Sequence, residues 1–185
     1  MIKKVWVLLL ALGCVSQVAA AGRDGHDGAS RRDSLVTFDG GIGVLPVSNV
    51  VVNATTGAIT VNRNIVRGVN PAGQIWVIAS LKADVFTDGR IKVRGRGLLL
   101  GGGNSIGQNA NQSVFATLIC EAAAPFVELN TTATGVPLEP NGDFRIDDTL
   151  AQAPLECPSP VLLIRSAGNQ SWFAAGIPSV GRNDD

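Results

Sequence analysis

The sequence predicts an all-β protein, an antiparallel β-sandwich that is immunoglobulin-like in general architecture. Charged residues make up only 16% of the 185 residues, whereas 22 residues are glycine, and this composition is typical of short strands joined by many turns. Runs that alternate apolar and polar residues recur along the chain with Gly, Asn, Asp or Pro between them, as in sandwiches. After residue 21, no segment repeats apolar residues at helical spacing.

The N-terminus, residues 1–21, is predicted to be a secretory signal peptide that is cleaved. Two lysines at positions 3 and 4 precede an apolar run over residues 5–15, and alanines at 19–21 suit a cleavage site. The apolar run is about 11 residues long and a bilayer span needs about 20, so it is no membrane anchor. The alternative is a lipoprotein signal in which Cys14 is lipidated. Both alternatives predict export, to the periplasm or the exterior of a bacterial cell.

The rest of the chain is predicted to form one domain between two polar ends. Residues 22–33 contain no apolar residue larger than alanine, so burial cannot offset their ordering entropy and we expect a flexible leader. Residues 34–180 are the predicted sandwich domain, with about seven to nine strands. Residues 181–185 are a polar tail, and no later segment is apolar for long enough to span a membrane.

The charge of the mature chain argues against two classes of partner. The full chain has 15 basic and 15 acidic residues, and two of the basic ones lie in the predicted signal peptide. The mature protein therefore carries a net charge of about −2, and general binding to nucleic acid or to an anionic membrane is not expected.

Cleavage would remove Cys14 and leave Cys120 and Cys157. Two cysteines in an exported protein most simply form a disulfide. Such a bridge would close a loop of about 38 residues and stabilise the fold by roughly 4 kcal/mol in the chain-entropy treatment. A zinc site is the weaker alternative, because neither cysteine has a histidine nearby in the sequence.

A hairpin over residues 74–100 gives the clearest structural signal. Two alternating runs, Ile75–Phe86 and Arg90–Leu100, flank the tripeptide Thr87-Asp88-Gly89, and Asp-Gly between alternating runs predicts a tight turn. Because side chains alternate along a strand, every second residue of the second run shares one face. We name these four cations the basic stripe: Arg90, Lys92, Arg94 and Arg96.

The remaining strands are expected from the same alternation and from the turn residues between them. In chain order they are Ser34–Phe38, Ile42–Val47, Val50–Val52, Ala58–Val69, Ser113–Glu121, Phe126–Thr131, Val136–Leu138, Asp143–Leu150, Val161–Arg165 and Ser171–Ala175. Asp39-Gly40-Gly41 is expected to end the first of them, and Pro46 should confine the second to an edge. Residues 151–160 contain three prolines and should be irregular.

The basic stripe is the main candidate for ligand binding. Four cations at alternate positions could bind a sulfate, a phosphate or an acidic glycan lying along the sheet. The more ordinary interpretation is a solvated strand face whose charge is neutralised from neighbouring strands. The acids that could do so are Asp84, Asp88, Asp143 and Asp147, and the alternation of Asp143, Arg145 and Asp147 suits a partner strand.

Trp172 is the other candidate for ligand binding, since it lies beside Phe173 near a turn and could stack on a sugar. Trp76 lies among aliphatic residues and is interpreted as core. The Asp-Gly and Asn-Gly pairs lack the spacing of a calcium loop, and Gly101–Gly107 lacks the Gly-Lys-Ser/Thr ending of a phosphate loop.

The sequence offers little for catalysis. His26, the only histidine, lies in the predicted leader, which would not hold a base rigidly against a nucleophile. Asp147 and Asp148 are adjacent, so in a strand their carboxylates point to opposite faces. We therefore predict no catalytic residue, no metal and no cofactor. The alternative is an extracellular hydrolase whose carboxylate pair is assembled by the fold.

A series of short motifs in the C-terminal half carries a resemblance. They are Gly97–Leu100, Ser113–Cys120, Gly142–Ile146, Cys157-Pro158, Pro160–Leu162 and Trp172–Ala174. In this order they resemble a pattern found in small exported bacterial β-rich proteins of unknown function. The resemblance implies export, a β-rich domain and a Cys120–Cys157 bridge, and it implies no activity and no site residues.

Taken together, the sequence predicts an exported, non-enzymatic binding or structural module. The expected partner is a glycan, another component of the bacterial envelope or another protein, and the ligand is expected to be anionic or a glycan. The sequence leaves the oligomeric state open.

Overall fold

The structure, a computed structural model, describes residues 34–179 and contains only strands, turns and loops in that range. The predicted signal peptide, leader and polar tail lie outside the described residues. The strands are β1 (Ser34–Gly43), β2 (Val47–Val52), β3 (Ile59–Arg63), β4 (Trp76–Val77), β5 (Ser80–Phe86), β6 (Arg90–Arg96), β7 (Leu99–Leu100), β8 (Ser113–Ile119), β9 (Leu129–Asn130), β10 (Val136–Pro137), β11 (Phe144–Thr149), β12 (Val161–Ser166) and β13 (Trp172–Pro178).

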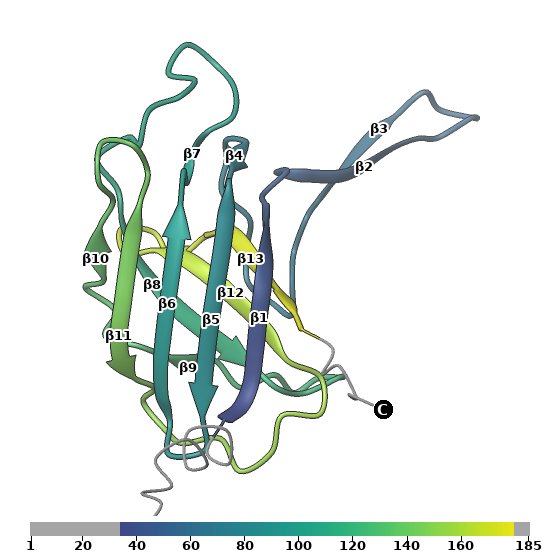
Figure 1. The fold of residues 1–185 in the computed structure, drawn as a ribbon. Helices are drawn as coiled ribbons and strands as arrows, with labels where there is room; N and C mark the ends of the chain where they lie inside the picture. Colours follow the sequence, from purple (N-terminus) through teal and green to yellow (C-terminus); the bar gives the residue numbers. More distant parts are fainter. Residues whose placement is uncertain (1–33, 180–185) are drawn as a thin grey trace, which may run out of the picture.

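Nine strands form one antiparallel sheet with the order β10-β8-β12-β13-β1-β5-β6-β11, and β9 pairs with β8 beside this path. The sheet curls into a half-barrel, so that β5, β6 and β11 form one layer and β8, β12 and β13 form the other (Figure 1). The end strands β10 and β11 come into contact without forming a ladder. The prediction of an all-β, antiparallel, sandwich-like fold is confirmed, although one curled sheet supplies both layers.

The core lies between the two layers and follows from the alternation of side chains. On β6 the residues Ile91, Val93 and Gly95 are buried, whereas those between them are exposed. A Cβ atom on Gly95 would lie 2.0 Å from the ring of Phe144, so the absent side chain is what lets this ring cover the strand. Gly176 serves the other layer in the same way, beside Phe38 and Leu162.

The hairpin predicted over residues 74–100 is confirmed in its central part. β5 and β6 pair from Ser80 opposite Arg96 to Val85 opposite Ile91, and Gly89 has a φ of 85° in the turn. The outer ends of the two runs leave this ladder and form a separate pair, β4 with β7. Gly97 has a φ of 65° at the point of departure, a left-handed conformation that interrupts a strand.

The first strand is longer than expected, so the prediction that Asp39-Gly40-Gly41 ends it is wrong. β1 runs on to Gly43 with a shift in register between Phe38 and Gly41. A Cβ atom on Gly41 would lie 2.8 Å from the Leu81 side chain, and one on Gly43 would lie 2.1 Å from the Trp76 carbonyl oxygen. These glycines therefore permit close approach and a bulge.

The disulfide is confirmed. Cys120 follows β8, Cys157 lies in the segment that leads into β12, and the two are bonded. The Ser159 amide also donates to the Cys120 carbonyl oxygen at 3.1 Å. The bridge therefore fixes the irregular, proline-rich segment against the end of a buried strand.

Replacement of Gly95 by alanine is expected to lower the free energy of unfolding by about 2 kcal/mol, because the new methyl group collides with the Phe144 ring. Urea unfolding followed by circular dichroism measures the change. Gly73→Ala is the matched control, since a Cβ atom at Gly73 meets nothing within 4 Å. Equal effects of the two substitutions would contradict the close-packing explanation.

Candidate functional site

The candidate site is the outer face of β5, β6 and β11. The four cations of the basic stripe are all exposed on this face, because their neighbours in β6 point into the core. The predicted partner strand is also confirmed: β11 pairs with β6 along its whole length, from Phe144 opposite Gly95 to Thr149 opposite Arg90.

Register across the three strands places three cations side by side. Arg94 lies opposite Lys82 of β5 on one side and opposite Arg145 of β11 on the other. Directly opposite residues in an antiparallel pair have Cβ atoms about 5 Å apart, and like charges in such positions destabilise a sheet. We call Lys82, Arg94 and Arg145 the cationic row.

The neighbouring row has the opposite character. Lys92 lies between Asp84 and Asp147, and its Nζ atom is 4.0 Å from the Asp147 carboxylate. This half of the basic stripe thus has the neutralised arrangement that a solvated strand face would have. Exposed pairs of this kind contribute little to stability.

Arg90 is neutralised by its own turn. Its Nε atom lies 2.6 Å from Asp88 Oδ2, and its guanidinium lies 4.9 Å from the centre of the Phe86 ring. The Arg90 backbone amide and then its side chain donate to Asp88, and these hydrogen bonds lower the pKa of that carboxyl. The Arg90 guanidinium is therefore already paired within its own turn.

The other cations of this face are less well compensated. Asp39 pairs with Lys82 at 3.2 Å, but within residues 34–179 no carboxylate oxygen lies within 4.0 Å of the guanidinium of Arg94, Arg96 or Arg145. The predicted acid Asp143 instead accepts a hydrogen bond from the Gly97 amide at 3.0 Å. Register thus leaves a local excess of positive charge on a chain whose basic and acidic residues are equal in number.

Two shallow hollows flank Arg94. One, of about 290 Å³, extends over the cationic row and the adjacent Asp84 and Lys92. The other, of about 190 Å³, is lined by Arg94, Arg96 and Arg145 together with the acids Glu139 and Asp143. The smaller hollow is open and suits a ligand that lies on the surface, whereas the larger one is more enclosed.

Trp172 does not contribute to this face. It is only 3% exposed, and its Nε1 atom donates to the Asn64 carbonyl oxygen at 3.0 Å. A buried indole cannot stack on a ligand from solvent, so Trp172 leaves the set of candidate ligand residues. Trp76 is core as predicted, and its ring stacks on Phe173 with centroids 4.1 Å apart.

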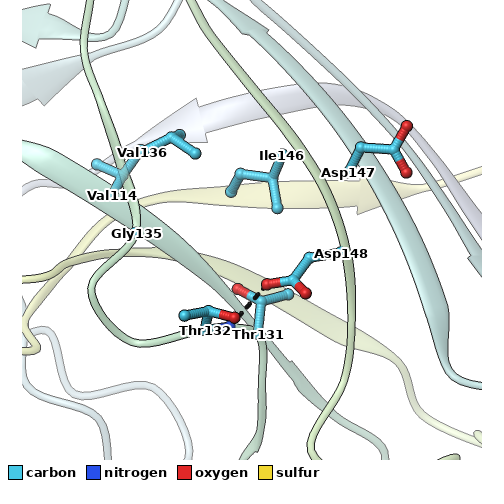
Figure 2. Close-up of a pocket in the computed structure, with 8 residues that line it drawn as sticks. All are labelled: Val114, Thr131, Thr132, Gly135, Val136, Ile146, Asp147 and Asp148. Carbon is cyan, nitrogen blue, oxygen red and sulfur yellow. Dashed lines mark hydrogen bonds between the residues drawn. The ribbon is translucent and has the colours of Figure 1, made fainter.

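A third hollow, of about 100 Å³, lies where β8, β10 and β11 meet at the two ends of the sheet (Figure 2). The Asp148 carboxylate accepts hydrogen bonds from the amides of Thr132 at 2.8 Å and Thr149 at 2.7 Å. Burial acts to raise the pKa of Asp148, but these hydrogen bonds outweigh it and the pKa lies below its ordinary value. Asp148 therefore joins β11 to the segment after β9.

The described acids include one pair of neighbours in a strand, Asp147 and Asp148 of β11. Asp147 and Asp148 point away from each other (Figure 2), as predicted. The pKa of Glu121, like those of Asp88 and Asp148, is lowered, chiefly because the Val127 amide donates to it. Residues 34–179 hold no cluster of three His, Cys, Asp or Glu side chains that could bind a metal ion.

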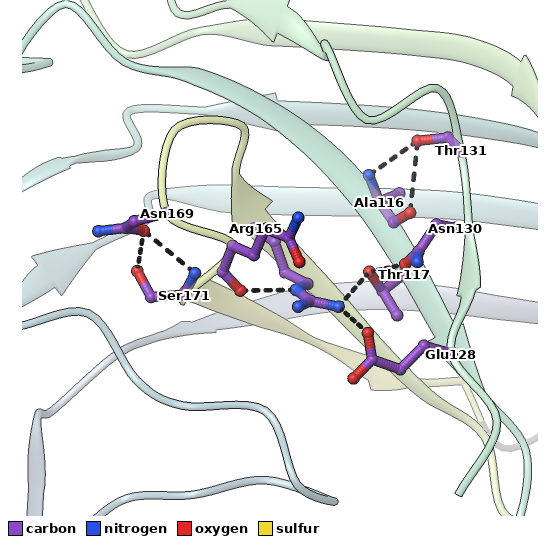
Figure 3. Close-up of polar contacts among 9 residues, drawn as sticks. Ala116, Thr117, Glu128, Asn130, Thr131, Arg165, Asn169 and Ser171 are labelled. Carbon is purple, nitrogen blue, oxygen red and sulfur yellow. Dashed lines mark hydrogen bonds and ion pairs between the residues drawn. The ribbon is translucent and has the colours of Figure 1, made fainter.

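A buried polar network lies on the other layer of the sheet (Figure 3). Arg165 of β12 is only 4% exposed, and its guanidinium donates to Glu128 at 2.5 Å, to the Gln170 carbonyl at 2.8 Å and to Thr117 Oγ1 at 3.3 Å. The sequence gives no separate signal for this network. Because Arg165 is enclosed and satisfied, its role is structural.

Compared with known protein families, with curated proteins and with solved structures, the chain matches none. Across the part of the chain that the structure describes, no helix has the length and apolar character needed to cross a membrane.

Asp148→Ala is expected to lower the free energy of unfolding by about 1 kcal/mol at pH 7, because two backbone amides lose a charged acceptor. A carboxyl whose pKa is lower in the folded state stabilises the protein above its unfolded pKa, about 3.9, and loses this contribution as the pH falls through the folded value. The difference between variant and wild type should therefore shrink below about pH 4.

Urea unfolding at several pH values measures this dependence. Asp147→Ala is the matched control, since that carboxylate belongs to the same strand and only approaches Lys92 at 4.0 Å. A deficit of Asp148→Ala that stays constant down to pH 2 would contradict the role assigned to the carboxylate.

Proposed function

We propose that this chain is an exported, non-enzymatic binding module that takes an anionic ligand on the outer face of β5, β6 and β11. The ligand class that fits is a sulfated or carboxylated glycan, or another anionic component of the bacterial envelope. One observation carries the proposal: the cationic row, with Arg94 between two other cations and no carboxylate of the described residues within 4.0 Å of Arg94 or Arg145.

The cationic row supports anion binding because of its energetic cost. Placing Arg94 opposite both Lys82 and Arg145 sacrifices cross-strand stability, whereas an acid at either flanking position would add to it. An anion over Arg94 would remove the repulsion, and guanidinium groups can bind sulfate or carboxylate groups through two hydrogen bonds each.

The shape of the face favours an extended ligand. The smaller hollow beside Arg94 is open, and β5, β6 and β11 lie side by side in one layer (Figure 1). A polymer with repeated negative charges could contact Arg96 and then the cationic row. A small single anion would contact only a part of this series.

Export is part of the proposal. A signal-like N-terminus precedes the domain in the sequence, and the Cys120–Cys157 disulfide suits an oxidising compartment such as the periplasm or the exterior. The resemblance to small exported bacterial proteins agrees with this location.

A non-enzymatic role fits the electrostatics of three of the described acids. The general acid of a glycoside hydrolase needs a raised pKa, whereas the pKa values of Asp88, Glu121 and Asp148 are lowered by hydrogen bonds that hold the charged form. These three carboxylates therefore stabilise turns and loops by accepting hydrogen bonds.

The proposal predicts that the mature protein binds immobilised heparin, used as a sulfated polysaccharide, and that binding weakens as salt is added. Arg94→Gln combined with Arg145→Gln should weaken binding at least tenfold, because about 1.4 kcal/mol or more is lost with two unneutralised cations. The same variant should unfold at equal or higher urea concentration than wild type, since a like-charge contact is removed.

Lys92→Gln combined with Arg90→Gln is the matched control. It removes the same amount of charge from the same face of the sheet, but from residues that already have acidic partners, and it should change the affinity less than threefold. Two results would overturn the proposal: absence of binding to both heparin and polygalacturonate, or equal weakening by the two double variants.

A further inference from the structure

The β2–β3 hairpin projects from the body of the protein as an arm (Figure 1). We define the arm as residues 47–63. It leaves and rejoins the body at one point, where the Asn64 amide donates to the Pro46 carbonyl oxygen at 3.0 Å and the Asn64 side chain donates to the Leu45 carbonyl oxygen at 3.1 Å. β2 and β3 pair only with each other among the described strands.

Register gives the arm two unlike faces. Val50 lies opposite Val61 and Val52 lies opposite Ile59, so these four side chains share one face. Val47, at the base and opposite Arg63, extends the same face. We call Val47, Val50, Val52, Ile59 and Val61 the aliphatic face.

The opposite face is mostly polar. It presents Asn49 opposite Asn62 and Val51 opposite Thr60, and the Asn62 side-chain Nδ2 donates to Asn49 Oδ1. Alternation of this kind is typical of strands with one buried and one solvated face. The arm therefore has the side-chain alternation of a sheet that buries one face and exposes the other.

Nothing in the described chain covers the aliphatic face. Its five side chains are between 40% and 68% exposed. The only charge in the arm is Arg63 at its base, and no charged residue occurs between Asp39 and Arg63, so most of the arm lacks the charges that usually protect exposed strands. An isolated two-stranded hairpin is only marginally stable in water, so burial of the aliphatic face against a partner would stabilise the arm.

We propose that the aliphatic face packs against the same face of a second copy of the chain. Two arms related by a two-fold axis would form a small four-stranded sandwich with both aliphatic faces inside. Each face offers roughly 500 Å² of surface, so the pair would bury about 1,000 Å², the lower limit of a specific interface. From Val47 to Asn62 the arm carries no charge, so two copies can meet there without direct repulsion.

A bilayer suits the arm less well. The outer edges of β2 and β3 carry backbone N–H and C=O groups that form no ladder with other described strands, and such groups cost several kcal/mol each in lipid. In the proposed dimer these edges stay in water. The tip is also polar, since Asn53 accepts hydrogen bonds from the amides of Thr55 and Thr56.

A different protein partner is also less suited. Unlike partners commonly recognise each other through complementary charge, which sets the rate and specificity of association. From Val47 to Asn62 the arm carries no charge that could take part in such recognition. Two identical aliphatic faces can associate by apolar burial without complementary charge.

Sedimentation of the mature protein over a concentration series tests the inference. Wild type should dimerise with a midpoint below about 100 μM. Val50→Asp combined with Val52→Asp should raise the dissociation constant at least 100-fold, because the new carboxylates would be buried opposite one another. Val51→Asp places the same charge on the polar face of the same strand and should change the constant less than threefold.

A second variant keeps the test decisive. Residues 47–63 can be replaced by two glycines, because the ends at Pro46 and Asn64 already meet, and this variant should be monomeric with the disulfide and the thermal unfolding of the body retained. The inference is overturned if wild type stays monomeric at about 100 μM, if the armless variant still dimerises, or if wild type binds neutral phosphatidylcholine vesicles as a monomer through the aliphatic face.

Discussion

The fold depends on the position of β1, which pairs with β13 on one side and with β5 on the other. Among the described strands, it alone joins the layer of β5, β6 and β11 to the layer of β8, β12 and β13 by backbone pairing. Gly41 and Gly43 let this strand pass close to Leu81 and Trp76 while the sheet bends. Because the first described strand pairs with the last, the core is complete only when both ends of the domain are in place.

Local patterns made much of this fold predictable. Alternation and an Asp-Gly turn located the β5–β6 hairpin, and the count of cysteines located the disulfide. The cationic row could not be predicted, because it depends on the register between strands that are about 50 residues apart, a non-local property. The burial of Trp172 and the exposure of the arm were not predicted, for a shared reason: a pattern shows which residues lie on one face, but only packing decides whether that face is covered.

The protein uses arginine in two physically different ways. Arg165 is buried and has a carboxylate, a carbonyl and a hydroxyl around its guanidinium, because a charge removed from water without partners would cost several kcal/mol. Arg94 remains in water, where a charge needs no partner, and its neighbours are cations. Solvation thus explains why one guanidinium is a fixed part of the fold and the other is free to meet a ligand.

The neck of the arm has a consequence for how such a protein can change over evolutionary time. Since the chain leaves at Pro46 and returns at the hydrogen-bonded Asn64, mutations, insertions and deletions beyond the neck do not alter any register in the nine-stranded sheet. The body is constrained by close contacts such as Gly95 against Phe144, whereas the arm is constrained only by what it touches. Divergent descendants should therefore share the body and differ in the length and composition of the arm.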